Sequence, residues 1–527
     1  MSEKKASLAI QQVGWALKTN QEAIPLCLQR ASLAQRGYEQ DTQHEGQVGC
    51  GIWISPLSML DILNVDICVL PNEHATADIR GTIDEEQEDA YLSLAQADLT
   101  VKVTQTDEIG KPCVLFSGII ADMEITNVNG LKVLDLKLIS PTRLMDLVEH
   151  TRTYQDASLD YLDLLSSLGN YPNYSFTMRV GEGAEIGDLI TQFKETDWEF
   201  VKRLASHHNS VVIPDYISGG VGYYFGIPET PSNIVVDPSH YRVFKGIGEY
   251  INKNRNQVSG MMENDSLYYI VRDKEIYRMG EKVRFKDKNL RVFGIHSVLE
   301  GQFLQNYYTL KTDAGFNSKK TFNFGLVGTS LSCIVTGVQK DLVQVHIHEA
   351  EGDYGSGTKW FAFSTVYSSP DGTGWYAMPE RGDELRLYFP SEHESQAYTI
   401  SAVNVDAPEM GAGRAPAPAG HPSLPAPRTD PDVKTMINKE LKEVSLYPDK
   451  IIMTNNNGMT IVVDDAGGIF IQSDKKVVIK SDEAITMASS QAEVSMLGAD
   501  KVSIMVGGTR VELTDDVKFE GGSLYMQ

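Results

Sequence analysis

Apolar residues near the end of this chain occur in pairs at positions i and i+2, and the pairs recur about every eight residues from position 444 onward. The i, i+2 spacing places both side chains of a pair on one face of a β-strand. Turn residues, such as the Asp-Asp-Ala-Gly-Gly of 464–468, separate the pairs. A short fixed period is typical of stacked β repeats, in which one repeat cannot bury its apolar face alone.

The length of the step limits what the repeat can form. Eight residues supply one strand and one turn, whereas a closed rung of a β-helix needs about three strands, so one chain supplies about a third of a rung. We therefore predict that residues 436–527 form a trimeric, intertwined, triple-stranded β-helix. The alternative is an ordinary β-meander, with strands of about five or six residues and less regular spacing. The expected core positions are Ile461, Val463, Ile469, Ile471, Val477, Ile479, Ile485, Val494, Val502, Ile504, Val511 and Leu513.

Charge and composition narrow the class of partner. With 47 Lys and Arg against 71 Asp and Glu, the net charge is −24. Such a charge argues against nucleic acid and against anionic membrane as standing partners. The acidic run 84–89 is predicted to be a solvated loop. Five scattered cysteines without a CxxC motif indicate a reducing compartment and no metal framework. The N-terminus has no apolar signal segment, so we expect synthesis in the cytoplasm without a signal peptide.

The chain is too long for one core and is predicted to be mainly β and multidomain. The predicted segments are a first β domain with an N-terminal extension (1–150), a helical connecting region (151–230), a second β domain (231–327), a small oligosaccharide/oligonucleotide-binding (OB) type barrel (328–405), a Pro/Ala/Gly-rich linker (406–435) and the repeat (436–527). Helices are expected over 158–168 and within 188–205, where Thr196 and Glu199 form a capping-box pattern.

Three motifs resemble those of a known family. Residues 152–158 (RTYQDAS) resemble an R-x-F-Q-x-x-S/T entry to a helix, and residues 195–204 resemble an E-T-D-x-x-F-x-x-R-L helix. A third motif resembles the signature of a small barrel. This barrel signature consists of Trp375, Pro379, Gly382, Asp383 and Glu384. Together the motifs are similar to those of VgrG-type spike proteins of type VI secretion and of the fused hub-and-spike proteins of contractile phage tails.

The resemblance implies a structural, membrane-piercing spike. Three chains would form a hub with two tube-like β-barrel domains per chain, which seats a hexameric inner tube; the OB-type barrel would form a collar, and the repeat a needle. The implied partners are two further copies, inner tube proteins, baseplate proteins, a PAAR-type tip protein and, transiently, a target membrane; nucleic acid is not among them. The expected docking site for the tip protein is Leu524, Tyr525, Met526 and Gln527.

Features that the chain lacks indicate the type of injection system and the alternative classes of function. A compact chain that stops at Gln527 without an effector extension resembles the spike of extracellular contractile injection systems of the antifeeding-prophage and virulence-cassette kind, released as a phage-tail-like particle. A type VI VgrG spike and a phage baseplate spike are the alternatives. Because no nucleophile elbow, HExxH, P-loop or GxGxxG motif is present, we expect no enzyme activity, no cofactor and no catalytic or metal site. A trimeric tailspike that degrades polysaccharide and a glycan-binding adhesin are further alternatives.

The histidines are expected to be unremarkable in function. His346 and His348 lie at i, i+2 on a predicted strand, a spacing that can chelate a metal, but no carboxylate or cysteine cluster accompanies them. We predict that they are exposed barrel residues. His207 and His208 follow a predicted helix, and we expect them to be cations at the helix C-terminus, stabilised by its dipole.

Overall fold

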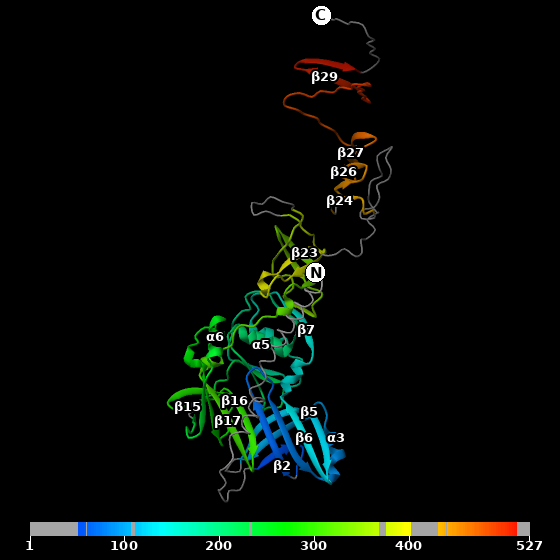
Figure 1. The fold of residues 1–527 in the computed structure, drawn as a ribbon. Coiled ribbons are helices and arrows are strands. Elements are labelled where there is room, and N and C mark those ends of the chain that lie inside the picture. The colour runs from blue at the N-terminus through cyan, green and yellow to red at the C-terminus, as the bar shows by residue number, and fades with distance from the viewer. Residues whose placement is uncertain are drawn as a thin grey trace, which may run out of the picture. The chain divides into compact units, whose positions relative to one another are not determined.

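The computed structural model describes residues 51–59, 61–106, 111–230, 234–367, 376–401, 430–438 and 440–513. The chain divides into two compact units, Met1–Ala402 and Val403–Gln527 (Figure 1). Strands predominate in both units, as the sequence predicts. Every helix among the described residues is too short or too polar to span a bilayer.

A twelve-stranded sheet organises the first unit. In order across the sheet its strands are β1 (Ile52–Ser55), β4 (Thr100–Thr106), β5 (Pro112–Val128), β6 (Leu131–Ile139), β3 (Thr76–Ile83), β2 (Asp61–Val69), β16 (Lys288–Glu300), β17 (Phe303–Lys311), β14 (Leu267–Asp273) and β13 (Tyr241–Lys245), with β15 (Lys282–Phe285) paired to β16 and to β12 (Ile234–Val235). The antiparallel pairing of β2 with β16, from Val69 opposite Ile295 to Asp66 opposite Val298, joins the two halves. One hydrophobic core extends through both halves.

Tight turns fix the register of two hairpins in this sheet. Asn129 and Gly130 connect β5 to β6 with φ values of 54° and 86°. Lys286 and Asp287 connect β15 to β16 with φ values of 47° and 60°. Positive φ at both central residues gives the twist that a two-residue hairpin needs. The strict alternation of β6 then places Leu134, which is fully buried, on the core face of the strand.

In the sequence, a connecting region of short strands and helices comes between the two halves of the sheet. Its elements are β7 (Glu149–Tyr154), α4 (Tyr161–Ser166), β8 (Ser175–Met178), β9 (Ile190–Thr196), α5 (Asp197–His207), β10 (Val212–Pro214) and β11 (Gly222–Phe225). The capping box of Thr196 and Glu199 is confirmed at the start of α5. The helix predicted within 188–205 is wrong in its first part: Thr196 is the N-cap, so the chain enters in an extended conformation and Ile190–Thr196 pairs with β7.

The remaining helices are short. Those that are α-helical within the described residues are α3 (Glu88–Leu94) and α6 (Ile247–Arg255). The 3₁₀ segments are η1 (Glu85–Gln87), η2 (Pro141–Asp146), η3 (Glu263–Ser266), η4 (Asp313–Phe316), η5 (Phe324–Leu326) and η6 (Glu394–Gln396).

The predicted small barrel is a five-stranded antiparallel sheet whose edges meet. Its strands, in order, are β21 (Phe361–Ala362), β19 (Leu342–His346), β18 (Ser330–Gln339), β22 (Glu384–Tyr388) and β23 (Tyr398–Ser401). Ser364 N–H donates to Thr399 O at 2.8 Å, and Thr399 Oγ1 donates to Ala362 O at 3.0 Å. These bonds bridge β21 and β23, so the sheet curls into a closed barrel. The OB-type assignment stays a prediction.

The second unit contains an antiparallel meander followed by a hairpin. The meander consists of β24 (Lys434–Ile437), β25 (Glu443–Leu446), β26 (Lys450–Thr454), β27 (Met459–Asp464) and β28 (Gly468–Ser473); the hairpin pairs β29 (Val502–Val506) with β30 (Thr509–Leu513). Over Lys434–Ser473 the structure therefore has the meander that the sequence left as an alternative. The reason is local, because the turns at 455–458 and 464–468 reverse the chain and let neighbouring strands pair. Between these two sheets, residues 474–501 contain no strand.

Most of the predicted linker, residues 402–429, and the expected docking site at 524–527 lie outside the described residues. Cys68 is disulfide-bonded, whereas Cys113 and Cys333 are free thiols. The disulfide at Cys68 differs from what the reducing compartment predicted from the sequence would favour.

Candidate interaction surface

The meander presents one continuous apolar face. Cross-strand partners share a face of a sheet, and the register places the predicted i, i+2 pairs in two adjacent rows. The first row is Met436, Val444, Met453, Ile461 and Ile471, and the second is Leu446, Ile451, Val463 and Ile469. The sequence prediction that the members of each pair share a face is confirmed for β25–β28. We call these nine side chains the apolar face.

The apolar face is open in the single chain. Ile461 and Val463 are each 42% exposed, and Ile469 is 71% exposed. The opposite side of the same sheet contains the buried residues, with Ile452 and Val462 each 3% exposed. The meander therefore exposes the side that its sequence makes most hydrophobic, which is the reverse of what a free-standing sheet does.

A buried polar cluster lies on the opposite side of the sheet, so the two faces differ in polarity. The carboxylate of Glu443 is buried, and Ser445 Oγ donates to its Oε1 at 2.5 Å. Asn456 Nδ2 donates to its Oε2 at 3.1 Å. These polar groups satisfy one another's hydrogen bonds within the chain, whereas the nine side chains of the apolar face contain no hydrogen-bonding group.

A groove of about 770 Å³ runs along the apolar face. Its apolar lining includes Met436, Val444, Met453, Ile461, Ile471 and Val477. Val477 belongs to the next repeat, so the groove continues the apolar face beyond the meander. The following predicted core positions are also exposed, with Ile479 61%, Ile485 49%, Val494 50% and Ile504 52% exposed. Val502 is half-buried, and the side chains of Val511 and Leu513 lie outside the description.

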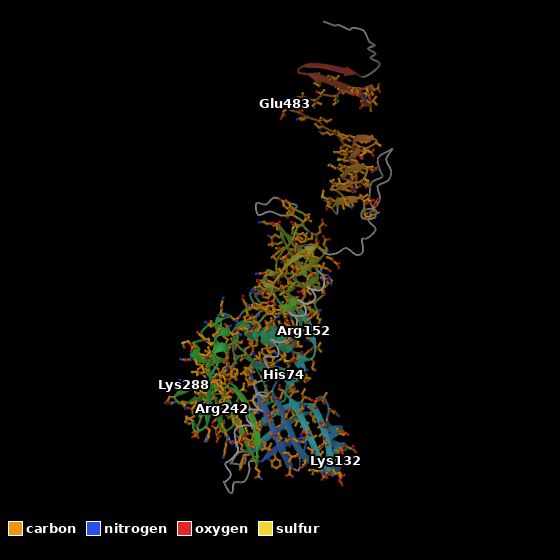
Figure 2. The ribbon with its side chains drawn as sticks, viewed as in Figure 1. His74, Lys132, Arg152, Arg242, Lys288 and Glu483 are labelled. Atoms are coloured by element: carbon orange, nitrogen blue, oxygen red, sulfur yellow. The ribbon has the colours of Figure 1, made fainter. Side chains whose placement is uncertain are left out.

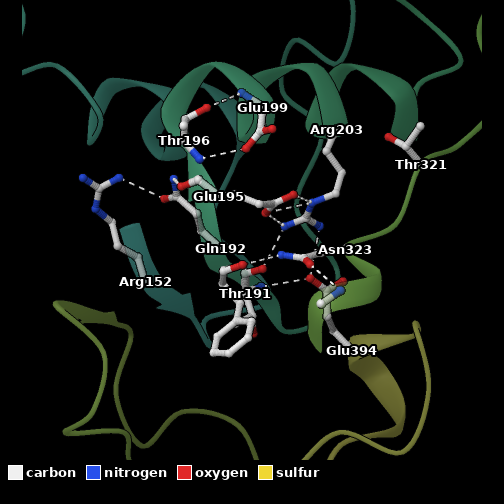
Figure 3. A network of polar contacts seen from close by, with 12 residues as sticks. Arg152, Thr191, Gln192, Glu195, Thr196, Glu199, Arg203, Thr321, Asn323 and Glu394 are labelled. Carbon is white, nitrogen blue, oxygen red and sulfur yellow. Dashed lines mark hydrogen bonds and ion pairs between the residues drawn. The ribbon is translucent and has the colours of Figure 1, made fainter. Parts of the chain in front are cut away.

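In the first unit, the E-T-D-x-x-F-x-x-R-L motif forms a buried ion-pair cluster (Figure 3). Arg203 Nε lies 2.8 Å from Glu195 Oε1, and Arg203 Nη2 lies 2.8 Å from Glu195 Oε2. Arg203 Nη1 also donates to Glu394 Oε1 at 3.2 Å. Burial alone would lower the pKa of Arg203, but the charges of Glu394 and Glu195 raise it, so the guanidinium stays charged.

This cluster crosses a domain boundary. Glu394 belongs to the segment between β22 and β23 of the barrel, whereas Arg203 and Glu195 belong to the connecting region. Glu394 Oε1 also accepts a hydrogen bond from Thr191 N–H at 3.0 Å. The carboxylate of Glu394 therefore attaches the barrel to both β9 and α5.

The other helix-entry motif binds the barrel through Gln155. Gln155 Nε2 donates to Val345 O at 3.1 Å and to Asp353 Oδ1 at 2.7 Å. Asp353 is buried in β20 (Gly352–Tyr354), which pairs in parallel with β7 and so extends a sheet of the connecting region into the barrel. Asp353 also accepts hydrogen bonds from Thr153 Oγ1 at 2.7 Å and from Ile347 N–H at 2.8 Å.

The two motifs are joined to each other. Arg152 Nη1 lies 2.5 Å from Asp197 Oδ1, and Tyr171 OH donates to Asp197 Oδ2 at 2.6 Å. Sequence reasoning identified both motifs but missed Asp353 and Glu394, because single carboxylates after turns carry no local pattern. The motif residues and these two partners form what we call the joint between the connecting region and the barrel.

The barrel signature has a structural role where it is described. Trp375 lies outside the described residues. Gly382 has φ of 94° and donates through its N–H to Val335 O at 2.9 Å. Asp383 Oδ2 accepts the N–H of Glu380 at 2.8 Å, which closes the turn between Pro379 and β22, the strand that begins at Glu384.

The prediction that His346 and His348 are exposed barrel residues is confirmed, whereas the prediction for His207 is wrong. His346 is half-exposed, with Nδ1 3.0 Å from Asp353 Oδ2, and His348 is also partly exposed. The described residues contain no group of three or more side chains able to hold a metal. His207 is not the cation that we predicted: burial, with the positive charges of Arg203 and Lys320, lowers its pKa to about 3. His207 is neutral and bonds to Tyr161 OH at 3.0 Å. Burial also lowers the pKa of His208, against the same prediction.

Comparison with known proteins gives matches to structures only. No protein-family model and no curated protein matches the chain. The E. coli c3393 protein, a type VI secretion component with structural similarity to the T4 bacteriophage tail proteins gp27 and gp5, is 12% identical with a TM-score of 0.46, covering 66% of this chain and 99% of its own. The half-lidded Francisella PdpA–VgrG complex is 10% identical with a TM-score of 0.49, covering 88% and 93%.

A prophage protein also matches. The 43 kDa tail protein of prophage MuSo2 from Shewanella oneidensis is 9% identical with a TM-score of 0.38, covering 51% of this chain and 99% of its own. This chain is similar to spike and tail proteins. These are the classes that the sequence motifs resemble.

Proposed function

We propose that the protein is the central hub and spike of a contractile, phage-tail-like injection machine. In this role it is a homotrimer that joins a hexameric inner tube to a membrane-piercing needle. It contacts baseplate proteins, carries a PAAR-type protein at its tip and meets the target membrane only during puncture. It is made in the cytoplasm and released within a particle of the extracellular type. No catalytic role is proposed for it.

The observation that carries this proposal is the open apolar face. Its side chains are about half exposed in the single chain, and fully burying an apolar side chain contributes roughly 1.5–3 kcal/mol. Nine such residues in two rows make it unfavourable for the chain to remain alone in water. Two further copies of the meander are the occupants, because three such faces turned towards one axis bury one another in a shared core.

The joint supports a mechanical role. A spike driven through a membrane transmits force along the chain, and a flexible connection between barrel and hub would lose it. The ion pairs of Arg203 with Glu195 and Glu394, and the bonds from Gln155 to the barrel, hold the two parts at several points. Buried charge-assisted hydrogen bonds are among the strongest polar contacts available.

The oligomeric state tests this function. Ile461→Asp places a carboxylate on the apolar face, whereas Gln472→Asp places the same group on the opposite, exposed face of the adjacent strand. By light scattering we expect a mass near three times 58.3 kDa for the wild type and for Gln472→Asp, and loss of that mass for Ile461→Asp. A monomeric wild type, or a trimeric Ile461→Asp variant, would refute the proposal.

Different measurements distinguish the proposed function from the alternative functions. A type VI spike or a phage baseplate spike would give the same trimer and differ only in the particle with which it is purified. Release of reducing sugar from capsular polysaccharide would indicate a tailspike enzyme, and glycan binding by the trimer an adhesin. For tip docking, truncation after Gly522 should abolish binding of a PAAR-type protein and leave the trimer intact.

A further inference from the structure

A basic hairpin stands out on this acidic chain. Four basic residues lie within seven positions of the β15–β16 hairpin, although the whole chain has a net charge of −24. They are Lys282, Arg284, Lys286 and Lys288, and all four are exposed. Figure 2 shows Lys288 at the periphery of the twelve-stranded sheet. The tight Lys286-Asp287 turn holds these charges together at the tip.

Little within the chain neutralises this charge. Arg284 Nη2 lies 3.0 Å from Asp287 Oδ1, but both side chains are more than half exposed, so solvent screens the pair. Lys286 Nζ lies 3.5 Å from the centre of the Tyr241 ring, a contact that leaves the positive charge in place. Lys282 and Lys288 form no ion pair with another described residue. The hairpin therefore keeps a surplus of positive charge.

The surface beside the hairpin is apolar and includes an edge strand of the sheet. Strand β13 is the last strand in the order, and all five of its residues are exposed. Val243 is 50% exposed, and Ile247 and Ile251 of the adjoining α6 are 44% and 45% exposed. An uncovered edge strand with apolar side chains is normally paired or covered in a stable protein.

The complementary charge lies at the opposite end of the same sheet. In the acidic segment 84–89, Asp84, Glu85, Glu86 and Asp89 are exposed, whereas Glu88 pairs with Lys132. Exposed apolar residues also accompany this segment, since Leu92 is 52% and Leu131 is 51% exposed. Figure 1 shows α3 and β15 at opposite ends of the twelve-stranded sheet, so the two charged segments cannot meet within one chain.

We propose that the basic hairpin 282–288 of one copy docks on the acidic segment 84–89 of the next copy. Contacts between two different surfaces of identical chains are head-to-tail, and they close into a ring when the rotation permits. Opposite charges fix which ends meet and disfavour like ends. The inference rests on the proposed trimer and specifies the contact between copies in the first unit, a contact separate from the apolar face of the second.

Zero-length carbodiimide cross-linking of the full-length protein, followed by mass spectrometry, tests the contact. We expect intermolecular links between Glu85, Glu86 or Asp89 and Lys282, Lys286 or Lys288. Charge reversal by K282E/K286E/K288E removes those amines, so intermolecular proximity in this variant is read from disulfide formation in a background with R284C and D84C. The disulfide yield should fall about tenfold relative to the R284C/D84C protein alone.

Reversing the charges of the acidic segment as well gives the variant that tests the pairing directly. Adding E85K/E86K/D89K to the reversed hairpin should restore the disulfide yield, whereas K319E/K340E/R381E, which changes the net charge equally at exposed positions elsewhere, should leave it unchanged. Loss of the wild-type link above about 0.5 M salt would agree with an exposed electrostatic contact.

The outcomes separate this inference from the proposed function. A trimeric mass without the 84–89 to 282–288 links, or failure of the reciprocal swap, would overturn the docking proposal alone. A monomeric wild type without those links would overturn both. Binding to phosphatidylglycerol vesicles that K282E/K286E/K288E abolishes, in a protein without the links, would assign the hairpin to anionic lipid and overturn the proposed occupant.

Discussion

Arg203 of helix α5 and Glu195 of strand β9 form a two-pronged ion pair, with both nitrogen–oxygen distances at 2.8 Å and the guanidinium only 4% exposed. The eight-residue separation brings the end of a strand alongside the second turn of the following helix. The third contact of the guanidinium, to Glu394, comes from the barrel. One side chain of a local motif thus links two domains.

Loss of the Arg203 guanidinium should weaken this joint strongly. Arg203→Met leaves two carboxylates buried without a counter-charge, and removing one partner of a buried ion pair costs about 3–5 kcal/mol. Arg203→Lys keeps the charge but cannot bind Glu195 at two points, so a smaller loss is expected. The denaturation midpoint in urea measures both. The exposed Arg381→Met is the control, and a midpoint for Arg203→Met equal to that of the wild type would contradict the assigned role.

Asp353 should be equally important for attaching the barrel. Asp353→Ala removes the acceptor of Thr153, Gln155 and Ile347, and each unsatisfied buried donor costs about 1–3 kcal/mol. We expect faster proteolysis between the connecting region and the barrel. The exposed Asp341→Ala should match the wild type. Unchanged cleavage of Asp353→Ala would show that the joint does not depend on this carboxylate.

Stability should fall in mild acid because of His207. In the unfolded chain a histidine takes up a proton near pH 6.5, but in the folded protein burial holds the pKa of His207 at about 3. The contribution of neutral His207 is therefore complete above pH 6.5. As pH falls from 6.5 towards 3 the unfolded state binds the extra proton, and the free energy of unfolding decreases by about 1.4 kcal/mol per pH unit.

The variant His207→Gln isolates this effect. Urea midpoints measured from pH 7.5 to pH 4.5 should decrease less steeply for His207→Gln than for the wild type. The exposed His240→Gln should keep the wild-type slope. Parallel slopes for His207→Gln and the wild type would mean that burial does not lower the pKa of His207 in the folded protein.

The two described free thiols should differ in reactivity. Burial raises the pKa of Cys333 to about 12, and its side chain is fully buried in the barrel. Cys113 is half-buried, with Sγ 3.2 Å from Arg278 Nη2. Because the thiolate is the reactive form, iodoacetamide at pH 8 should modify Cys113 well before Cys333. Mass spectrometry after digestion reads both sites, and equal rates would indicate that the barrel opens readily.

Local patterns were predictable where one segment carries its own signal. The capping box of Thr196 and Glu199 was expected from spacing alone and starts helix α5. The apolar pairs of 444–471 lie on one face, as their period of two requires. The strand at Ile190–Thr196 was missed because its pairing partner, β7, lies 40 residues earlier. The neutral state of His207 was also missed, since burial depends on residues remote in sequence.

The sequence by itself determined the elements, the apolar periodicity of the second unit and the two motifs of the joint, because strand alternation, caps and turns depend on a few neighbouring residues. Only the tertiary structure decided that β2 pairs with β16 and that Asp353 and Glu394 bind the side chains of the two motifs. It also decided that the basic hairpin and the acidic segment lie at opposite ends of one sheet. Long-range pairing and burial depend on which distant residues share an environment, and no short stretch of sequence carries that information.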